Sequence, residues 1–282
     1  MLAARLARHC RAELHVLHAE HPMLDAAADH AGIDLTQETR EELQRFTAAT
    51  VPATDSSPQL HVVAGTAVEA ILEHAHQHRA DLVVVGGRGM SGAEKFVFGS
   101  TTEGLLRRSE VSVLVVPTGW MAPRPTAPDL SGVGPIVVGV DPSDSSIAAL
   151  KAAHALAAVL GTSAEAVHVV PDLAVLERWR GHADVAVRNR VTAARQELEP
   201  LVQALGDSVP VQLQIVVGTV PERLAAAASI DRDRAPLIVL GKKAPGSQGG
   251  APGTVAYRVL STANVPVLMY VDRSASSSTS AR

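Results

Sequence analysis

The sequence of 282 residues is poor in the residue types that mark several classes of protein. Its single cysteine, Cys10, excludes an internal disulfide framework and favours a cytoplasmic location. Aromatic residues make up only 2 % of the sequence and the formal net charge is −4. The chain therefore offers few rings on which bases could stack and no basic surface, which disfavours nucleic-acid binding. No apolar run approaches the roughly twenty residues of a membrane span. We therefore expect a cytoplasmic protein that binds neither nucleic acid nor a membrane.

Apolar segments of strand length alternate with segments of helical periodicity, which predicts an α/β chain with buried parallel strands. The same order of segments occurs twice, at an offset of about 152 to 155 residues. The matching pairs are Ala12–Glu20 with Ala164–Asp172, His61–Leu72 with Gln214–Leu224, Asp81–Gly86 with Pro236–Gly241, and Val111–Val116 with Val265–Tyr270. The sequence thus predicts two tandem, doubly wound α/β domains.

The stretch between the two copies is rich in proline and glycine, which is typical of a linker. We therefore expect a first domain over residues 1–117, a linker over 118–134 and a second domain over 135–272. The polar, low-complexity tail over 273–282 is predicted to be disordered.

The second copy opens with a β-branched strand, a turn at Asp141 and an alanine-rich helix, whereas the first copy lacks this strand. Met1 aligns near Ala153, already inside that helix, so the first copy lacks the opening part of the repeat unit. The first strand of a doubly wound sheet has a neighbour on both sides, so its loss leaves two strands unpaired. We interpret the difference as a misplaced start codon in preference to a tolerated deletion.

Glycines gather between Gly86, which ends an apolar strand, and Gly99, which precedes a helical stretch. Glycine lets a ligand approach the backbone, and a helix N-terminus offers unpaired N–H groups to an anion. A phosphate is therefore the expected ligand, although turns and a helix cap would explain each residue singly. Gly87, Gly89 and Gly92 fit G-x-G-x-x-G only weakly, because they do not follow the first strand of a unit. No G-x-x-x-x-G-K-[ST] motif occurs.

Ser100 and Glu103 have the spacing of a capping box, which predicts Ser100 as the helix N-cap. The N–H groups of Ser100 and Thr101 would then receive phosphate oxygens, helped by the helix dipole. Arg88 could neutralise a further phosphate, although an exposed arginine in a turn is more often only solvated.

The full pattern is G-x2-G-x9-G-[ST], formed by Gly86, Gly89, Gly99 and Ser100. It resembles the nucleotide-binding signature of the universal stress protein family, and the resemblance extends over nearly the whole chain. It implies five parallel strands per domain and a site for ATP or AMP, with or without Mg²⁺. In this resemblance Asp141 after the first strand reads the adenine, and the glycine motif holds the ribose and phosphates.

The same resemblance implies that the closing strands, 111–116 and 265–271, pair the two domains as an internal pseudo-dimer. A homo-oligomer and an unidentified protein partner remain open. The second copy departs from the signature, because Ala244 replaces the middle glycine and Gly253-Thr254 arrives one residue early. Gly241 keeps the first glycine position, but the shorter loop must take a different path, so this second phosphate site is doubtful.

Two further groups of residues have structural explanations. Asp141 can form an Asx turn, with Ser143 or Asp144 as the cap of the following helix. His74, His76 and His78 lie beside the apolar stripe of one helix, and no third metal ligand is placed by the sequence. We therefore predict no metal site.

Three functions are compatible with the sequence. The first is a non-enzymatic stress-response protein whose partners or conformation depend on bound adenine nucleotide. The second is a nucleotide-hydrolysing enzyme on the same fold, but only Glu94 and Glu103 lie near the glycine motif as carboxylates for such chemistry. The third is a scaffold whose nucleotide sites have decayed.

Overall fold

The computed structural model describes residues 2–51, 57–87, 99–120, 133–172, 180–229, 235–243 and 254–273. These residues form two compact units, one of residues 2–83 and one of the described residues from Val84 onward. Among the described helices, none combines the length and the apolar character needed to cross a membrane.

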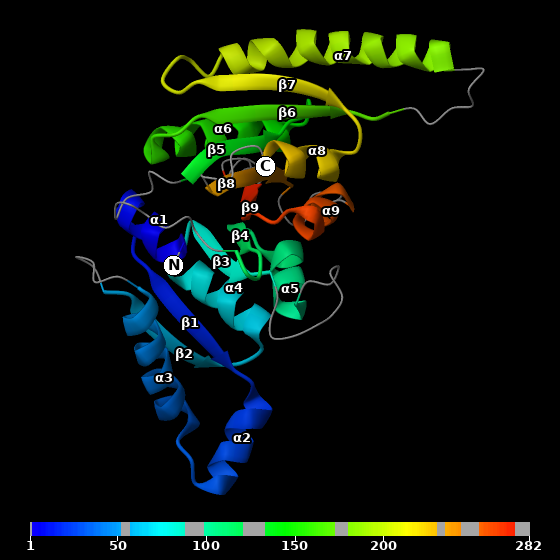
Figure 1. Cartoon of the computed structure of the whole chain (residues 1–282). Helices are drawn as coiled ribbons and strands as arrows, with labels where there is room; N and C mark the ends of the chain where they lie inside the picture. Colours follow the sequence, from blue (N-terminus) through cyan, green and yellow to red (C-terminus); the bar gives the residue numbers. More distant parts are fainter. Residues whose placement is uncertain are drawn as a thin grey trace, which may run out of the picture. The chain divides into compact units, whose positions relative to one another are not determined.

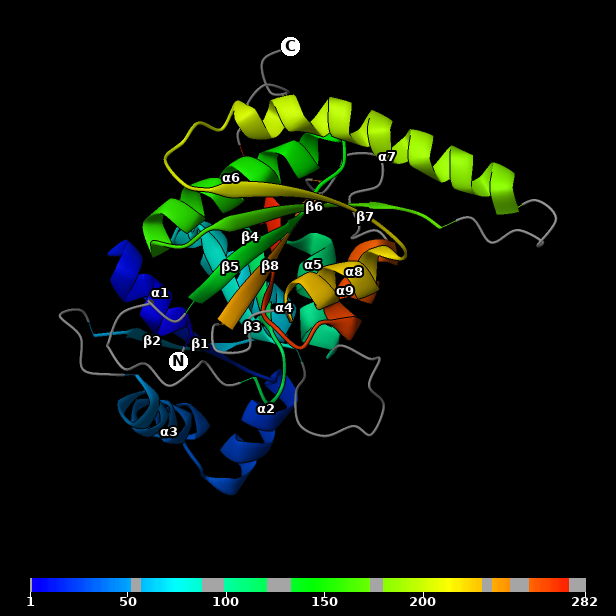
Figure 2. The same ribbon diagram turned by 45° about the horizontal axis from the view of Figure 1, so that its top comes forward.

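The second unit is built on a seven-stranded sheet with the order β3-β4-β9-β8-β5-β6-β7. Its strands are β3 (Leu82–Gly86, which begins at the end of the first unit), β4 (Ser112–Val116), β5 (Val133–Gly139), β6 (Ala164–Val170), β7 (Val211–Val217), β8 (Ala235–Lys242) and β9 (Val267–Val271). Its helices are α5 (Ser100–Arg108), α6 (Asp144–Leu160), α7 (Arg180–Gln203), α8 (Val220–Ala227) and α9 (Thr254–Thr262). Helices α6 and α7 cover one face of strands β8-β5-β6-β7, and α8 and α9 lie on the other (Figure 2). The arrangement is a doubly wound sheet.

Strand β5 is the middle one of the five strands of the second repeat, because it pairs in parallel with β6 on one side and β8 on the other. Ile136, Val137 and Val138 are all 0 % exposed. Helices on both faces explain why three consecutive side chains of one strand are buried, and why the sequence reads there as a continuous apolar run.

Strands β4 and β9 pair in antiparallel register, with Leu114 opposite Leu268. Each is the last strand of its repeat and would otherwise present an open edge. The pairing confirms the prediction that the closing strands of the two repeats lie against each other, and it joins β3 and β4 to the five strands of the second repeat.

The first unit contains a separate, two-stranded parallel sheet. Its elements are α1 (Leu2–Cys10), β1 (His15–Glu20), α2 (Pro22–Ala31), α3 (Leu35–Thr50), β2 (Gln59–Ala64) and α4 (Ala67–Gln77). Helix α3 lies on one face of the two strands and α4 on the other (Figure 1).

The predicted repeat is confirmed element by element, since β1, β2, β3 and β4 correspond to β6, β7, β8 and β9. The equivalent glycines Gly65 and Gly218 have φ angles of +144° and +146°, each in the turn between a strand and a helix. Such positive φ values explain why both copies keep glycine there.

The first repeat has no equivalent of β5 in this sequence. Because β5 pairs with both β6 and β8, this difference accounts for the placement of their equivalents, β1 and β3, in two separate sheets. Most of the predicted linker (121–132) and of the tail (274–282) falls outside the described residues. The domain boundaries therefore stay a prediction.

Candidate functional site

The carboxyl ends of β5 and β8 mark the point where the strand order reverses. From β5 the chain continues through β6 and β7 on one side, while β8 and β9 lie on the other. In open α/β sheets ligands bind in the crevice at such a point. Asp141 closely follows β5, and Gly241 is the last residue but one of β8. The structure thus brings two of the predicted site residues to neighbouring strand ends.

Asp141 organises the turn between β5 and α6. Its Oδ1 accepts hydrogen bonds from the backbone N–H of Ser143, at 3.0 Å, and from the Ser143 hydroxyl. Ser143 is the N-cap of α6, and its hydroxyl oxygen accepts from the N–H of Ser146. Of the two caps considered, Ser143 is therefore the one observed, while Asp144 lies in the first helical turn. The carboxylate of Asp141 is exposed, so it can also reach a ligand.

Gly241 packs against the first turn of α6. A Cβ at this position would lie 2.1 Å from the carbonyl oxygen of Ser145 and 2.9 Å from the backbone N of Ser146. Both contacts are with backbone, which cannot turn aside as the end of a side chain can. A glycine is therefore required at Gly241 for packing, whether or not a ligand binds beside it.

In the first repeat, the end of β3 is tied to the start of α5. The hydroxyl of Thr102 donates a hydrogen bond of 2.8 Å to the carbonyl oxygen of Gly86. The N–H of Gly87 donates to the carbonyl of Val116 at 2.7 Å, which holds the end of β3 against β4. The glycine that ends the strand and the helix start that follows it in the motif are therefore neighbours in space.

The predicted cap of α5 is wrong by one residue. Gly99 is the N-cap, without a side-chain cap hydrogen bond, and Ser100 is the first residue of the helix. The capping box with Ser100 as cap therefore does not form, and the Glu103 carboxylate instead lies 3.9 Å from Arg107 one turn later. The helix starts earlier than the pattern predicts because Gly99 has the extended conformation of a cap (φ −59°, ψ 146°).

The start of α5 still offers backbone N–H groups to an anion. Ser100 and Thr101 occupy the first two positions of α5, where backbone N–H groups have no acceptor within the helix. Ser100 is exposed and Thr101 half-buried, so a ligand can reach them. The positive end of the helix dipole favours a negatively charged group there.

Three of the predicted site residues, Arg88, Gly89 and Gly253, lie outside the described residues. Thr254 is the first residue of α9, and its backbone alone is described. For these positions the nucleotide-site assignment stays a prediction.

A buried amine lies at the end of β8, beside the strand-end glycine. Lys242 is 4 % exposed, and its Nζ donates a hydrogen bond of 2.8 Å to the carbonyl oxygen of Ser109. Burial lowers the pKa of Lys242 to about 8, against a smaller opposing effect of the Glu110 carboxylate. Lys242 is not among the predicted residues, because no sequence pattern signals a buried lysine at a strand end.

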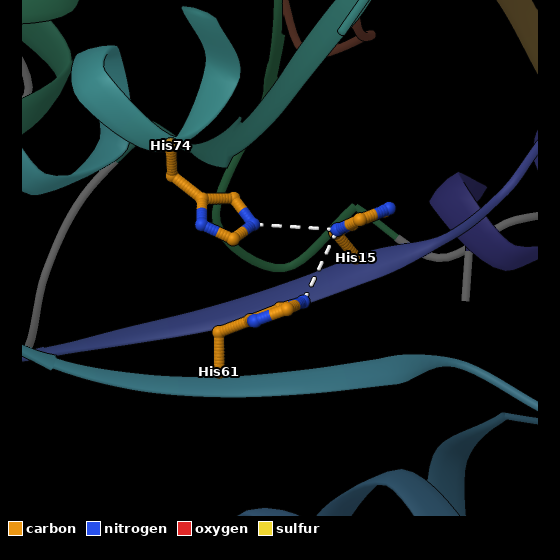
Figure 3. A group of neighbouring side chains, drawn as sticks. All are labelled: His15, His61 and His74. Atoms are coloured by element: carbon orange, nitrogen blue, oxygen red, sulfur yellow. Dashed lines mark hydrogen bonds between the residues drawn. The ribbon is translucent and has the colours of Figure 1, made fainter. Parts of the chain in front are cut away.

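A second group of residues that the sequence does not predict gathers in the first unit. His15 on β1, His61 on β2 and His74 on α4 each contribute one ring nitrogen to a set whose members lie within 4.8 Å of one another (Figure 3). Burial, and secondarily the charge that His15 and His78 would carry, lowers the pKa of His61. Burial first, followed by the neighbouring rings, lowers the pKa of His74 to about 4. The surroundings of both rings thus favour the neutral imidazole over its protonated form.

The signal for this cluster is present in the sequence but not decisive. His74 and His78 share one helix, but His15 and His61 lie on separate strands whose pairing the sequence does not predict. In the parallel register His61 lies opposite Leu17, two residues from His15 on the same face of the sheet. The strand pairing and the packing of α4 on β1 bring the rings together.

Comparisons with known proteins agree with this architecture. The sequence model of the Universal stress protein family matches residues 2–117 and 132–270. The stress response protein NhaX of Bacillus subtilis is 37 % identical over 57 residues, which cover 20 % of this chain and 34 % of that relative. The matched segment is thus about a third of the length of NhaX.

Solved structures show the same fold over most of the chain. A universal stress protein from Archaeoglobus fulgidus has a TM-score of 0.63 at 20 % identity, with 95 % of this chain and 91 % of that chain covered. A putative universal stress protein from Pseudomonas aeruginosa has a TM-score of 0.60 at 19 % identity, with coverages of 95 % and 86 %. With two matched regions that together span most of the sequence, this chain belongs to the Universal stress protein family.

Proposed function

We propose that this chain binds an adenine nucleotide, ATP or AMP, and acts as a non-enzymatic regulatory protein in a stress response. The observation that carries the proposal is the hydrogen bond between Thr102 and Gly86, because it holds the N-terminus of α5 beside the end of β3. Strand end and helix start together form the kind of backbone surface that binds phosphate.

In this proposal the first repeat supplies the phosphate-binding end. The N–H groups of Ser100 and Thr101 receive phosphate oxygens, and Gly99 leaves room for their approach. Gly86 lies next to the ribose. The family resemblance adds Gly89 to the same site, and Arg88, its neighbour in the sequence, neutralises a further phosphate in this proposal.

The second repeat retains other elements of the expected site, at the end of a different strand of the sheet. Asp141 keeps an exposed carboxylate at the switch point, suited to accept hydrogen bonds from an adenine amino group. Gly241, Gly253 and Thr254 occupy the positions of the altered glycine motif. Since the first repeat has no equivalent of Asp141 in this sequence, each repeat retains a different part of the expected site.

The test is calorimetric titration of the full chain with ATP and with AMP, in the presence and absence of Mg²⁺. Gly99→Val places a Cβ and two methyl groups where phosphate should approach, and its extended backbone accepts valine without strain. Affinity should therefore fall at least about tenfold, while the free energy of unfolding falls by only about 1 kcal/mol, because valine is a poorer N-cap than glycine. Gly181→Val is the matched control, because a Cβ there meets nothing within 4 Å.

Three outcomes separate the alternatives. Unchanged ATP affinity in the Gly99→Val chain would remove the phosphate site from α5. Turnover of ATP well above background would favour the nucleotide-hydrolysing enzyme. A parent chain that neither binds ATP nor carries nucleotide through purification would favour the decayed scaffold.

A further inference from the structure

We propose that His15, His61 and His74 bind a divalent transition-metal ion, and that Zn²⁺ matches the site best. The proposal is independent of nucleotide binding, because all three histidines lie in the first unit, on β1, β2 and α4.

The nitrogen positions fit a tetrahedral ion. The Nδ1 atom of His15 lies 3.1 Å from Nε2 of His61 and 3.3 Å from Nε2 of His74. In a tetrahedral zinc site with Zn–N bonds of about 2.05 Å, neighbouring nitrogens are about 3.3 Å apart. Two of the three separations therefore already have the required length, and one ring nitrogen from each residue lies within 4.8 Å of the other two.

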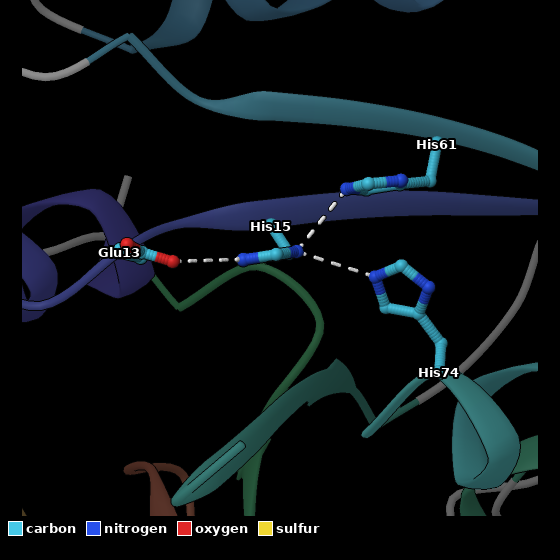
Figure 4. A network of polar contacts seen from close by, with 4 residues as sticks. All are labelled: Glu13, His15, His61 and His74. Carbon is cyan, nitrogen blue, oxygen red and sulfur yellow. Dashed lines mark hydrogen bonds and ion pairs between the residues drawn. The ribbon is translucent and has the colours of Figure 1, made fainter. Parts of the chain in front are cut away.

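His15 is oriented as a ligand by a carboxylate. The Oε2 atom of Glu13 lies 3.5 Å from Nε2 of His15, on the side of the ring away from the cluster (Figure 4). A carboxylate there favours the proton on Nε2, which leaves the lone pair of Nδ1 directed at the other two histidines. Carboxylate–histidine–metal arrangements of this kind fix the tautomer and raise the basicity of the ligand.

The fourth coordination position lies next to His78. The centroid of its ring is 4.1 Å from that of His74 and 4.5 Å from that of His15. His78 is exposed, whereas the three ligands are half-buried, so an ion enters from its side. We assign this position to water, because a ring nitrogen of His78 is not part of the compact set.

The donor set decides the class of ion. Three imidazole ligands without a carboxylate suit zinc, copper, nickel or cobalt, whereas Mg²⁺ and Ca²⁺ require oxygen ligands. Copper(II) prefers tetragonal geometry, and zinc accepts the tetrahedral spacing seen here. The three side chains come from two strands and a helix, so the ion would hold α4 against β1 and β2.

The proposal is tested by titrating ZnSO₄ into the full chain, without a polyhistidine tag, and following heat release. We expect one Zn²⁺ per chain. His61→Ala and His74→Gln should each weaken Zn²⁺ at least about tenfold, the lower end of what even an outer-shell loss costs. His76→Ala is the matched control, because this exposed histidine lies on α4 outside the cluster. The affinity of this variant for Zn²⁺ should equal that of the parent chain.

Glu13→Gln gives a second measurement that does not depend on a buried position, since the Glu13 side chain is 80 % exposed. It should weaken Zn²⁺ about tenfold without changing the stoichiometry. Circular dichroism establishes that each variant is folded, and Zn²⁺ should raise the melting temperature of the parent chain in a way that EDTA reverses. The proposal is overturned if the parent chain binds no Zn²⁺, or if His61→Ala, His74→Gln and His76→Ala all bind as the parent does.

Discussion

The hydroxyl of Thr102, on α5, donates a 2.8 Å hydrogen bond to the backbone carbonyl of Gly86, at the end of β3. Thr102 is only 3 % exposed, whereas Gly86 is exposed, so the donor of this hydrogen bond is shielded from water although its acceptor is not. The contact therefore stabilises the junction at which we propose phosphate to bind.

We predict that Thr102→Val lowers the free energy of unfolding by about 1 kcal/mol, since the shape is kept and one partly buried hydrogen bond is lost. Urea denaturation measures the change. Thr192→Val is the control, because the Thr192 hydroxyl also donates to a backbone carbonyl, that of Arg188, but at an exposed position. Equal decreases in the free energy of unfolding of the two variants would show that the Thr102 hydrogen bond contributes no more than an exposed one.

Gly241 gives a sharper prediction, because the neighbouring atoms are backbone. Gly241→Ala would bring a Cβ to 2.1 Å from the Ser145 carbonyl oxygen, so α6 or β8 must move. Gly139→Ala meets the movable methyl group of Leu240 at 2.8 Å. We expect the free energy of unfolding to fall by about 3 kcal/mol in Gly241→Ala and by less in Gly139→Ala. Urea denaturation of both variants under the same conditions measures the two changes. The reverse order would contradict this explanation.

Much of this fold could be predicted because its signals are local. The apolar runs of β5 and β8, the turn glycines Gly65 and Gly218 and the repetition of both patterns each reflect a short stretch of chain. The antiparallel pairing of β4 with β9 could also be inferred, because each is an apolar strand that closes its repeat and needs a neighbour.

The errors occur where a local pattern competes with packing. The spacing of Ser100 and Glu103 predicts a capping box, but the helix begins one residue earlier and Thr102 bonds to β3. The sequence draws attention to His74 but could not predict the whole cluster, because His15 and His61 are 46 residues apart. Their proximity depends on the register between two strands, which periodicity does not encode.

The pairing of β4 with β9 should make a large contribution to stability. Leu114 is 1 % exposed and lies opposite Leu268, so Leu114→Ala removes a buried side chain at the strand pair that joins the two repeats. We predict that this substitution lowers the free energy of unfolding by about 2 to 5 kcal/mol. Leu24→Ala is the control, because Leu24 is 63 % exposed, and its change should be within about 0.5 kcal/mol. Similar denaturation midpoints for the two variants would show that this contact contributes little.

The buried amine of Lys242 predicts a specific dependence of stability on pH. Its pKa is lowered to about 8 in the folded chain, from the value of 10.5 that an exposed lysine has. Between these two values the unfolded chain binds more protons at this residue than the folded chain does, so stability rises with pH. The stabilisation from a neutral Lys242 is complete above pH 10.5 and is lost as the pH falls through about 8.

Lys242→Met removes this titration while retaining an unbranched buried side chain. The stability of the parent chain should therefore rise relative to Lys242→Met as the pH increases from 8 to 10.5, because its buried charge disappears. The neutral amine can still donate to Ser109, so the hydrogen bond does not account for the trend. Urea denaturation of both chains at several pH values measures the difference, in which the remaining lysines and tyrosines cancel. A difference that stays constant over this range would show that Lys242 keeps an ordinary pKa in the folded protein.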